Sequence, residues 1–191
     1  MDIAQLIRDE SAKYHALHER VHQTYLRRHV DRASQEAWRQ ACKAFHAFRS
    51  SLDLLFERAF QEITYCDKTL IEFVICFLEA DPRFFRSGYI KQVLLTRIKR
   101  SVLCESDQRR LRGVCIDAVS RRGGREFKYY SRLAAALADD LLIAQLEDAA
   151  GGALATRASR ARMMLARISQ RRTEIAARRH SARVDTDPVS A

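Results

Sequence analysis

The spacing of apolar side chains predicts helices along nearly the whole chain. The pattern appears first in residues 2–29, where a rotation of about 100° per residue collects the apolar side chains on one side. These are Ile3, Leu6, Ile7, Tyr14, Leu17, Val21 and Tyr25. Residues 34–63 carry the strongest periodic signal and begin at Ser34, whose hydroxyl can cap a helix N-terminus. We expect a single central helix over that range.

Five further helices are predicted downstream of these two. Their expected ranges are about 67–80, 88–100, 107–120, 125–149 and 153–179. The segment LIEFVICFL in the first of them is apolar on nearly all sides, which is typical of a buried helix. Two pairs of glycines, Gly123-Gly124 and Gly151-Gly152, separate the last three helices, because glycine tolerates the left-handed conformation that ends a helix.

These elements indicate the fold class and the domain organisation. No segment alternates with a period of two, and only two prolines and six glycines interrupt the 191 residues, so we expect long helices and no sheet. The chain is predicted to be all-α, an irregular helical bundle or stacked helical hairpins of about seven helices. Residues 1–150 are expected to form a single helical domain. Residues 151–179 then form a basic amphipathic helix, docked on that domain or extending from it, and 180–191 a disordered tail.

Positive charge is concentrated in the second half of the sequence. The chain has 34 Lys and Arg against 24 Asp and Glu, a formal net charge of +10. Residues 82–132 alone hold 14 basic and 4 acidic residues, whereas residues 1–81 are slightly acidic. Such a surface suits an anionic partner, which is nucleic acid, acidic lipid or an acidic protein face.

The basic region places cations outside the apolar faces of three successive predicted elements, with several aromatic residues nearby. The candidate nucleic-acid-binding residues are Lys91, Lys99, Arg100, Arg109, Arg110, Arg112, Arg121, Arg122, Arg125, Lys128 and Arg132. Contacts to phosphates need a dispersed positive surface of this kind. Two other interpretations stay open, an acidic protein partner and an arginine-rich surface that is merely solvated. Nucleic acid is the partner we expect first, provided that these cations converge into one accessible patch.

Four of the six histidines lie close together in the sequence. His15, His18, His22 and His29 project within an arc of about 60° on a helix. A zinc ion with one Cys and three His ligands is conceivable if Cys42 and His46 of the next helix face this arc. The arc also borders the apolar stripe, where amphipathic side chains commonly pack at the edge of a core. We favour this packing role over a metal site or a pH-responsive surface, and we expect no metal and no cofactor.

No recognised catalytic motif is present. The sequence lacks a P-loop and the GxGxxG, HExxH and GxSxG patterns. Arg8 with His15, and Arg39 with His46, fit a loose arginine–histidine spacing of helical RNases of the HEPN type, but a chain this rich in arginine produces such pairs by chance. We assign no catalytic residue, and a helical RNase or metal-binding protein is only a third interpretation.

The cysteines and the N-terminus indicate a cytoplasmic protein. The five cysteines are odd in number and form no CxxC pair, which favours reduced, mostly buried thiols. The start MDIAQLIRDE has no apolar core of a signal peptide. The most apolar stretch, LIEFVICFL, is far shorter than the roughly 20 residues that span a bilayer.

One part of the chain resembles a known pattern. The segment FLEADPRFFRSGYIKQVLLTRIKR, followed by QRRLRGV and REFKYYSRLA, is similar to uncharacterised bacterial all-α proteins over roughly residues 76–135. This resemblance implies a bacterial cytosolic origin and no particular activity. It also implies that one structural unit contains Phe84, Phe85, Arg86, Tyr89, Arg125 and Phe127.

The sequence thus predicts a non-enzymatic, basic helical module that contacts nucleic acid, within a larger bacterial assembly. The alternative is a protein–protein adaptor that uses basic and amphipathic helix surfaces. The last helix carries a narrow apolar stripe among arginines, formed by Leu154, Ala158, Ala161, Met164, Leu165, Ile168 and Ile175. Docking of this helix on its own bundle is favoured over binding to a membrane or to a partner's groove.

Overall fold

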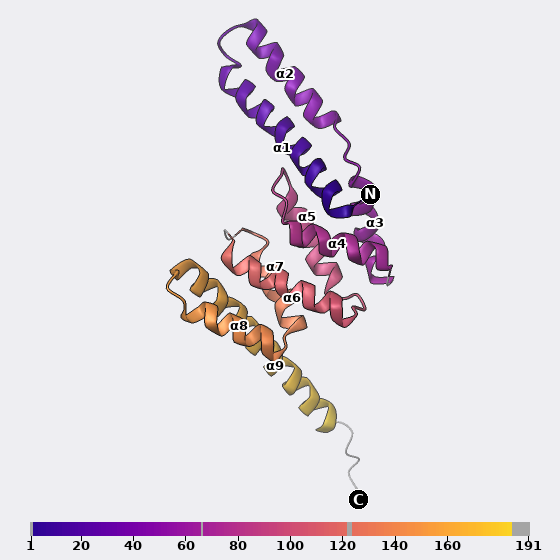
Figure 1. The fold of residues 1–191 in the computed structure, drawn as a ribbon, viewed down its shortest axis with the longest axis vertical. Coiled ribbons are helices and arrows are strands. Elements are labelled where there is room, and N and C mark those ends of the chain that lie inside the picture. The colour runs from indigo at the N-terminus through magenta and orange to yellow at the C-terminus, as the bar shows by residue number, and fades with distance from the viewer. Residues whose placement is uncertain (1, 66, 122–123, 185–191) are drawn as a thin grey trace, which may run out of the picture. The chain divides into compact units, whose positions relative to one another are not determined.

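The computed structural model describes residues 2–65, 67–121 and 124–184, and every regular element in those ranges is helical (Figure 1). The predicted all-α class is confirmed, but these ranges hold nine α-helices where about seven were expected. The chain divides into two compact units, Met1–Asp107 and Gln108–Ala191. This division near residue 107 lies inside the range 1–150 for which a single helical domain is predicted.

The first unit begins with an antiparallel helical hairpin of α1 (Ile3–Arg27) and α2 (Arg32–Ala47) (Figure 1). From residue 14 onward, the α1 residues that are shielded from solvent are Tyr14, Leu17, Val21 and Thr24. In α2 they are Ser34, Trp38, Ala41, Cys42 and Phe45. Alternating spacings of three and four are typical of the narrow seam of a two-stranded coiled coil. Most of these seam side chains are half-buried, and Ala41 is fully buried.

The central helix predicted over residues 34–63 is in fact two helices, α2 and α3 (Asp53–Glu62). The break is stabilised by Glu10 of α1, which accepts hydrogen bonds from Ser50 Oγ (2.7 Å) and the Ser51 backbone N–H (3.0 Å). Asp53 accepts a further bond from the Ser50 N–H at 2.9 Å. Polar groups of residues 50 and 51 are thus satisfied by a carboxylate far away in the sequence, which periodicity alone does not reveal.

The core of the first unit is formed around α4 (Lys68–Ala80), together with α3, the short 3-10 helix η1 (Ile63–Tyr65) and α5 (Ser87–Ile98). Asp67 caps α4 by accepting bonds from the backbone N–H groups of Thr69 and Leu70. Phe56, Phe73 and Phe77 pack ring against ring inside this core. The buried helix predicted over residues 67–80 is confirmed.

The second unit contains most of α6 and the three helices that follow it in the sequence. Their bounds are α6 (Glu105–Ser120), α7 (Phe127–Leu137), α8 (Asp140–Gly151) and α9 (Ala155–Val184). The helix predicted over residues 125–149 is two helices, because Asp139 leaves the helical conformation and caps α8 by accepting from the Leu142 N–H at 2.8 Å. Helices α7 and α8 both pack on α9, where Leu133, Leu146 and Met164 are fully buried.

Helix α9 is longer than expected. It continues to Val184, past the predicted end at residue 179, so the first part of the expected disordered tail is helical in its backbone. The remainder of that tail, residues 185–191, lies outside the described residues. Ala158, Ala161 and Ile168 are buried, and the first half of α9 packs against α7 and α8. From Arg172 to Arg179 every side chain is exposed.

The cysteine and membrane predictions meet the structure only in part. Four cysteines are described, all free thiols: Cys115 is buried, Cys42 and Cys76 are half-buried, and Cys104 is exposed. Burial raises the pKa of Cys115 to about 12. Cys66 lies outside the described residues. Within the described ranges no helix combines the length and the apolar character needed to cross a bilayer.

The segments of the bacterial resemblance fall in both units. Phe84, Phe85 and Tyr89 belong to the first unit, whereas Arg125 and Phe127 belong to the second. These residues therefore do not belong to one compact unit, contrary to what the resemblance implied. Within the first unit, the loop before α5 holds two non-glycine residues with left-handed backbone, Asp81 (φ 44°) and Arg86 (φ 68°).

Candidate nucleic-acid interface

The predicted cations are divided between the two units. Lys91, Lys99 and Arg100 belong to the first unit, and the remaining ones belong to the second. Arg122 lies outside the described residues. Whether the charge of each cation is available to a ligand therefore depends on its surroundings within its own unit.

Lys91 is not available. Its side chain is 2 % exposed and its Nζ lies 2.5 Å from Asp81 Oδ1. Asp81 is the left-handed residue that ends α4, so the ion pair ties the end of α4 to the second turn of α5. A buried ammonium needs such a partner because removal of its charge from water is costly. Lys91 is therefore removed from the candidate surface.

Arg112 is also a structural residue. Its guanidinium donates to the Leu137 carbonyl at the end of α7 (3.0 Å) and contacts Asp139 Oδ2 at 3.0 Å. Only 14 % of its side chain is exposed. Arg112 thus joins α6 to the break between α7 and α8, and it does not present a charge to solvent. Arg121 is similarly engaged with Asp117 of its own helix at 3.3 Å.

Several other arginines stabilise the C-terminal ends of helices. Arg160 donates to the Val119 carbonyl near the end of α6, and Arg162 donates to the Ala150 carbonyl near the end of α8. In the hairpin, Arg28 donates to the Tyr25 carbonyl and Arg49 to the His46 carbonyl. Helix C-termini leave carbonyls without partners and carry partial negative charge, so guanidinium groups bind there favourably. Part of the arginine excess therefore serves the fold.

A compact group of cations remains on α7. Lys128 and Arg132 are one helical turn apart and exposed, and both lie next to the ring of Tyr129. The Lys128 Nζ is 5.1 Å and the Arg132 Cζ 5.4 Å from the ring centroid. We call these three residues the α7 basic face. Arg125 is exposed in the turn just before α7 and adds a fourth polar group near its beginning.

The rest of α7 holds this face in place. Phe127, Tyr130, Leu133 and Ala134 are buried on the other side of the helix. The buried side fixes the rotation of α7, so Lys128 and Arg132 must point to solvent. Neither of them pairs with a carboxylate in the part of the chain that the structure describes.

The other predicted cations are dispersed. Arg100 follows α5 and is exposed, and Lys99 beside it is half-buried. On α6, Arg109 is exposed and Arg110 is half-buried. The nucleic-acid prediction depends on cations that converge into one accessible patch. In the second unit this patch is reduced to the α7 basic face together with Arg125.

The four N-terminal histidines are exposed on the hairpin. His15, His18, His22 and His29 are all exposed, and within the described ranges no three His, Cys, Asp or Glu side chains lie close enough to bind a metal ion together. The His18 ring lies 5.8 Å from the rings of both Phe45 and Phe85. His18 therefore contacts aromatic side chains at the edge of the hairpin seam.

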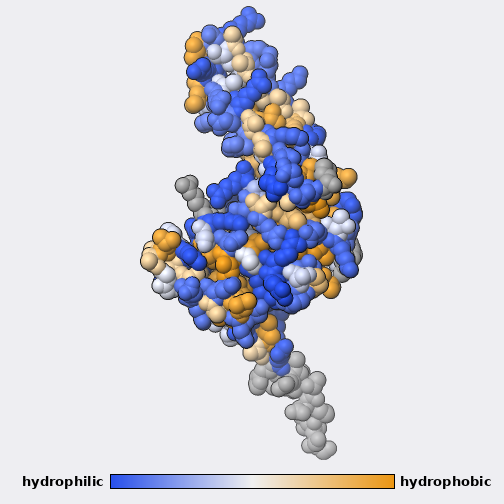
Figure 2. All heavy atoms as spheres, viewed as in Figure 1, coloured by the Kyte–Doolittle hydropathy of each residue, from blue (hydrophilic) through white to orange (hydrophobic). Residues whose placement is uncertain are grey.

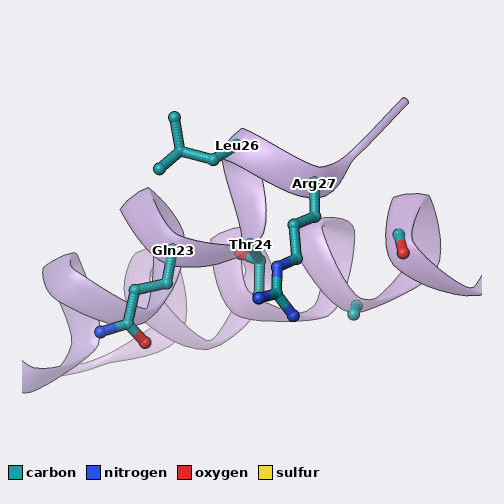
Figure 3. A pocket seen from close by; sticks show the side chains of 6 residues that line it. Gln23, Thr24, Leu26 and Arg27 are labelled. Atoms are coloured by element: carbon teal, nitrogen blue, oxygen red, sulfur yellow. The ribbon is translucent and has the colours of Figure 1, made fainter. Parts of the chain in front are cut away.

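The tip of the hairpin carries two strongly exposed apolar side chains. Leu26 is 71 % and Val30 73 % exposed. Beside them lies an open hollow lined by Gln23, Thr24, Leu26, Arg27, Ser34 and Ala37 (Figure 3). In Figure 3, Gln23 and Arg27 project to the same side of α1, whereas Leu26 points away from them. Figure 2 shows hydrophobic atoms at this tip within a mostly hydrophilic hairpin surface.

Comparison with protein-family models, with curated proteins and with solved structures finds no match to this chain.

Proposed function

We propose that this protein is a non-enzymatic helical module that contacts nucleic acid through the α7 basic face. One observation carries the proposal: Lys128 and Arg132 flank an aromatic ring on an exposed helix surface without a neutralising carboxylate. Cations that are free of carboxylates can replace the counterions of phosphates, which is the main source of affinity for nucleic acids.

Tyr129 gives this surface a second means of contact. Its ring is partly exposed between the two cations. Aromatic rings stack on nucleobases without regard to sequence, and nearby cations hold the backbone. This combination fits a strand with accessible bases, and it predicts weak sequence preference because base stacking and phosphate contacts depend little on base identity.

The test is a binding measurement with labelled DNA and RNA oligonucleotides, single-stranded and duplex, over a series of salt concentrations. Each phosphate contact adds about 0.9 to the slope of log K against log salt on duplex DNA. The double variant Lys128→Gln/Arg132→Gln should bind more weakly, with a slope lower by about one to two.

The hairpin offers a matched control. Arg39 and Lys43 of α2 are also exposed, one helical turn apart and without carboxylate partners among the described residues. Arg39→Gln/Lys43→Gln removes the same net charge and should leave affinity and slope nearly unchanged. Equal losses from both double variants would show that net charge alone drives binding, and the proposal would then be wrong.

A second candidate function is that of an adaptor, and the tip of the hairpin favours it. Exposed Leu26 and Val30 lie at the end of a coiled-coil hairpin, beside the hollow that Arg27 borders. Exposed apolar groups with a polar rim are a common feature of protein-binding surfaces. Leu26→Ser/Val30→Ser should abolish a stoichiometric, nuclease-resistant complex if this is the functional surface, and should leave nucleic-acid binding unchanged.

A further inference from the structure

One face of helix α9 changes from apolar to basic along the helix. Its packed face is formed at helical spacing by Ala158, Ala161, Met164 and Ile168, which are all buried. The same spacing continues through Arg171 and Arg172, then Ile175, then Arg178 and Arg179. The apolar positions that dock the helix are thus followed, on the same side, by two pairs of arginines.

The second half of α9 is exposed to solvent. Arg171 is half-buried, and all eight residues from Arg172 to Arg179 are exposed. A helix that no neighbour covers is held by its own backbone bonds, and isolated helices shorter than about 12–15 residues are only marginally stable in water. Binding of an anion to this segment would therefore stabilise its helical conformation.

The arginine charges of this segment are not neutralised. Its one acidic residue, Glu174, pairs with Arg167 at 3.5 Å. No carboxylate pairs with the four arginines in the part of the chain that the structure describes. Seven residues separate the two pairs, which places them about 10.5 Å apart along the helix axis. Each guanidinium can bind a phosphate through two hydrogen bonds.

We propose that Arg171, Arg172, Arg178 and Arg179, which we call the α9 arm, form a second phosphate-binding element of this protein. This inference rests on the proposed function, because it assigns the same class of ligand to a separate surface. Ile175 is the single large apolar side chain among residues 171–179. A membrane-binding helix needs a wide apolar face, and a protein interface usually has an apolar or aromatic centre, so phosphates fit the arm better than either.

The test uses the full chain and a labelled DNA duplex at several salt concentrations. The variant Arg171→Gln/Arg172→Gln/Arg178→Gln/Arg179→Gln should lower the slope of log K against log salt by roughly two to four. The matched control is Arg20→Gln/Arg27→Gln/Arg39→Gln/Lys43→Gln, which removes four exposed charges from the hairpin and should change the slope little.

A second variant tests whether the arm must be helical. Ala176→Pro keeps every charge but breaks the helix between the arginine pairs. We expect it to weaken binding several-fold, and we expect circular dichroism of the wild type to show added helix when the duplex is present. Both effects should be absent in the variant that lacks the four arginines.

The remaining outcomes separate the arm from the proposed function. If Lys128→Gln/Arg132→Gln weakens binding while the arm variant keeps the wild-type slope of log K against log salt, the proposal for the α9 arm is wrong. The proposal for the α7 basic face then stands. If the wild type binds no oligonucleotide, both are wrong. The arm variant could also bind oligonucleotides like the wild type but lose binding to phosphatidylserine vesicles or to an acidic protein. In that case the proposal that the α9 arm binds nucleic acid is wrong.

Discussion

Arginine has two distinct uses in this protein at the scale of single residues. Some arginines donate to backbone carbonyls at helix ends, as Arg112, Arg160 and Arg162 do, and others project into solvent without a carboxylate. The sequence does not distinguish them, because local spacing does not reveal which guanidinium contacts a carbonyl twelve or more residues away. The distinction decides which substitutions affect stability and which affect binding.

Arg112 and Arg109, three residues apart on α6, should show this difference directly. Arg112→Ala removes the bonds to Leu137 and Asp139 from a largely buried group, and hydrogen bonds to charged groups contribute about 1.5–3 kcal/mol each. We expect a loss of about 2–3 kcal/mol in the free energy of unfolding, measured by urea denaturation. Arg109→Ala, at an exposed position, should change that free energy by no more than about 0.5 kcal/mol.

At the scale of elements, the number of helices depends on capping contacts. Periodicity predicts one helix over residues 34–63 and one over 125–149, since the apolar spacing continues across both breaks. The chain breaks where Glu10 and Asp139 accept backbone N–H groups. The capping residue Asp139 is visible in the sequence, whereas the action of Glu10 on residues 50 and 51 requires the tertiary fold.

The break between α2 and α3 should be sensitive to acid. Burial by itself raises the pKa of Glu10, but bonds from Lys13, Ser50 and Ser51 outweigh it and lower the pKa below its ordinary value of 4.5. A carboxyl with a lowered pKa stabilises the fold above its unfolded pKa, and this contribution is lost as pH falls through the folded value.

The free energy of unfolding of the wild type should therefore decline as pH falls below about 4.5. Glu10→Gln should be less stable at neutral pH and should show a weaker decline, measured by denaturation at a series of pH values. The same acid dependence in Glu10→Gln and wild type would mean that other groups cause it.

At the scale of the whole molecule, local periodicity predicts the class of the fold and the buried helix α4, because both depend on residues close in sequence. The boundary near residue 107 was not predicted, since no glycine or proline marks it and the polar run at 105–110 is the first part of α6. The candidate site was predicted too broadly for a related reason. Net charge locates the basic region, but burial removes Lys91 and the helix ends occupy Arg112.

The division into two units has a measurable consequence. Each unit has its own buried core, around Phe73 and Phe77 in the first and around Leu133, Leu146 and Met164 in the second. Leu146→Ala creates a cavity that costs about 2–5 kcal/mol. Segments with separate cores can open separately, so amide hydrogen exchange should accelerate in α7, α8 and α9 and stay at the wild-type rate in α4. Phe73→Ala should produce the reverse pattern. Acceleration in both units from either substitution would show that the chain unfolds as one cooperative body.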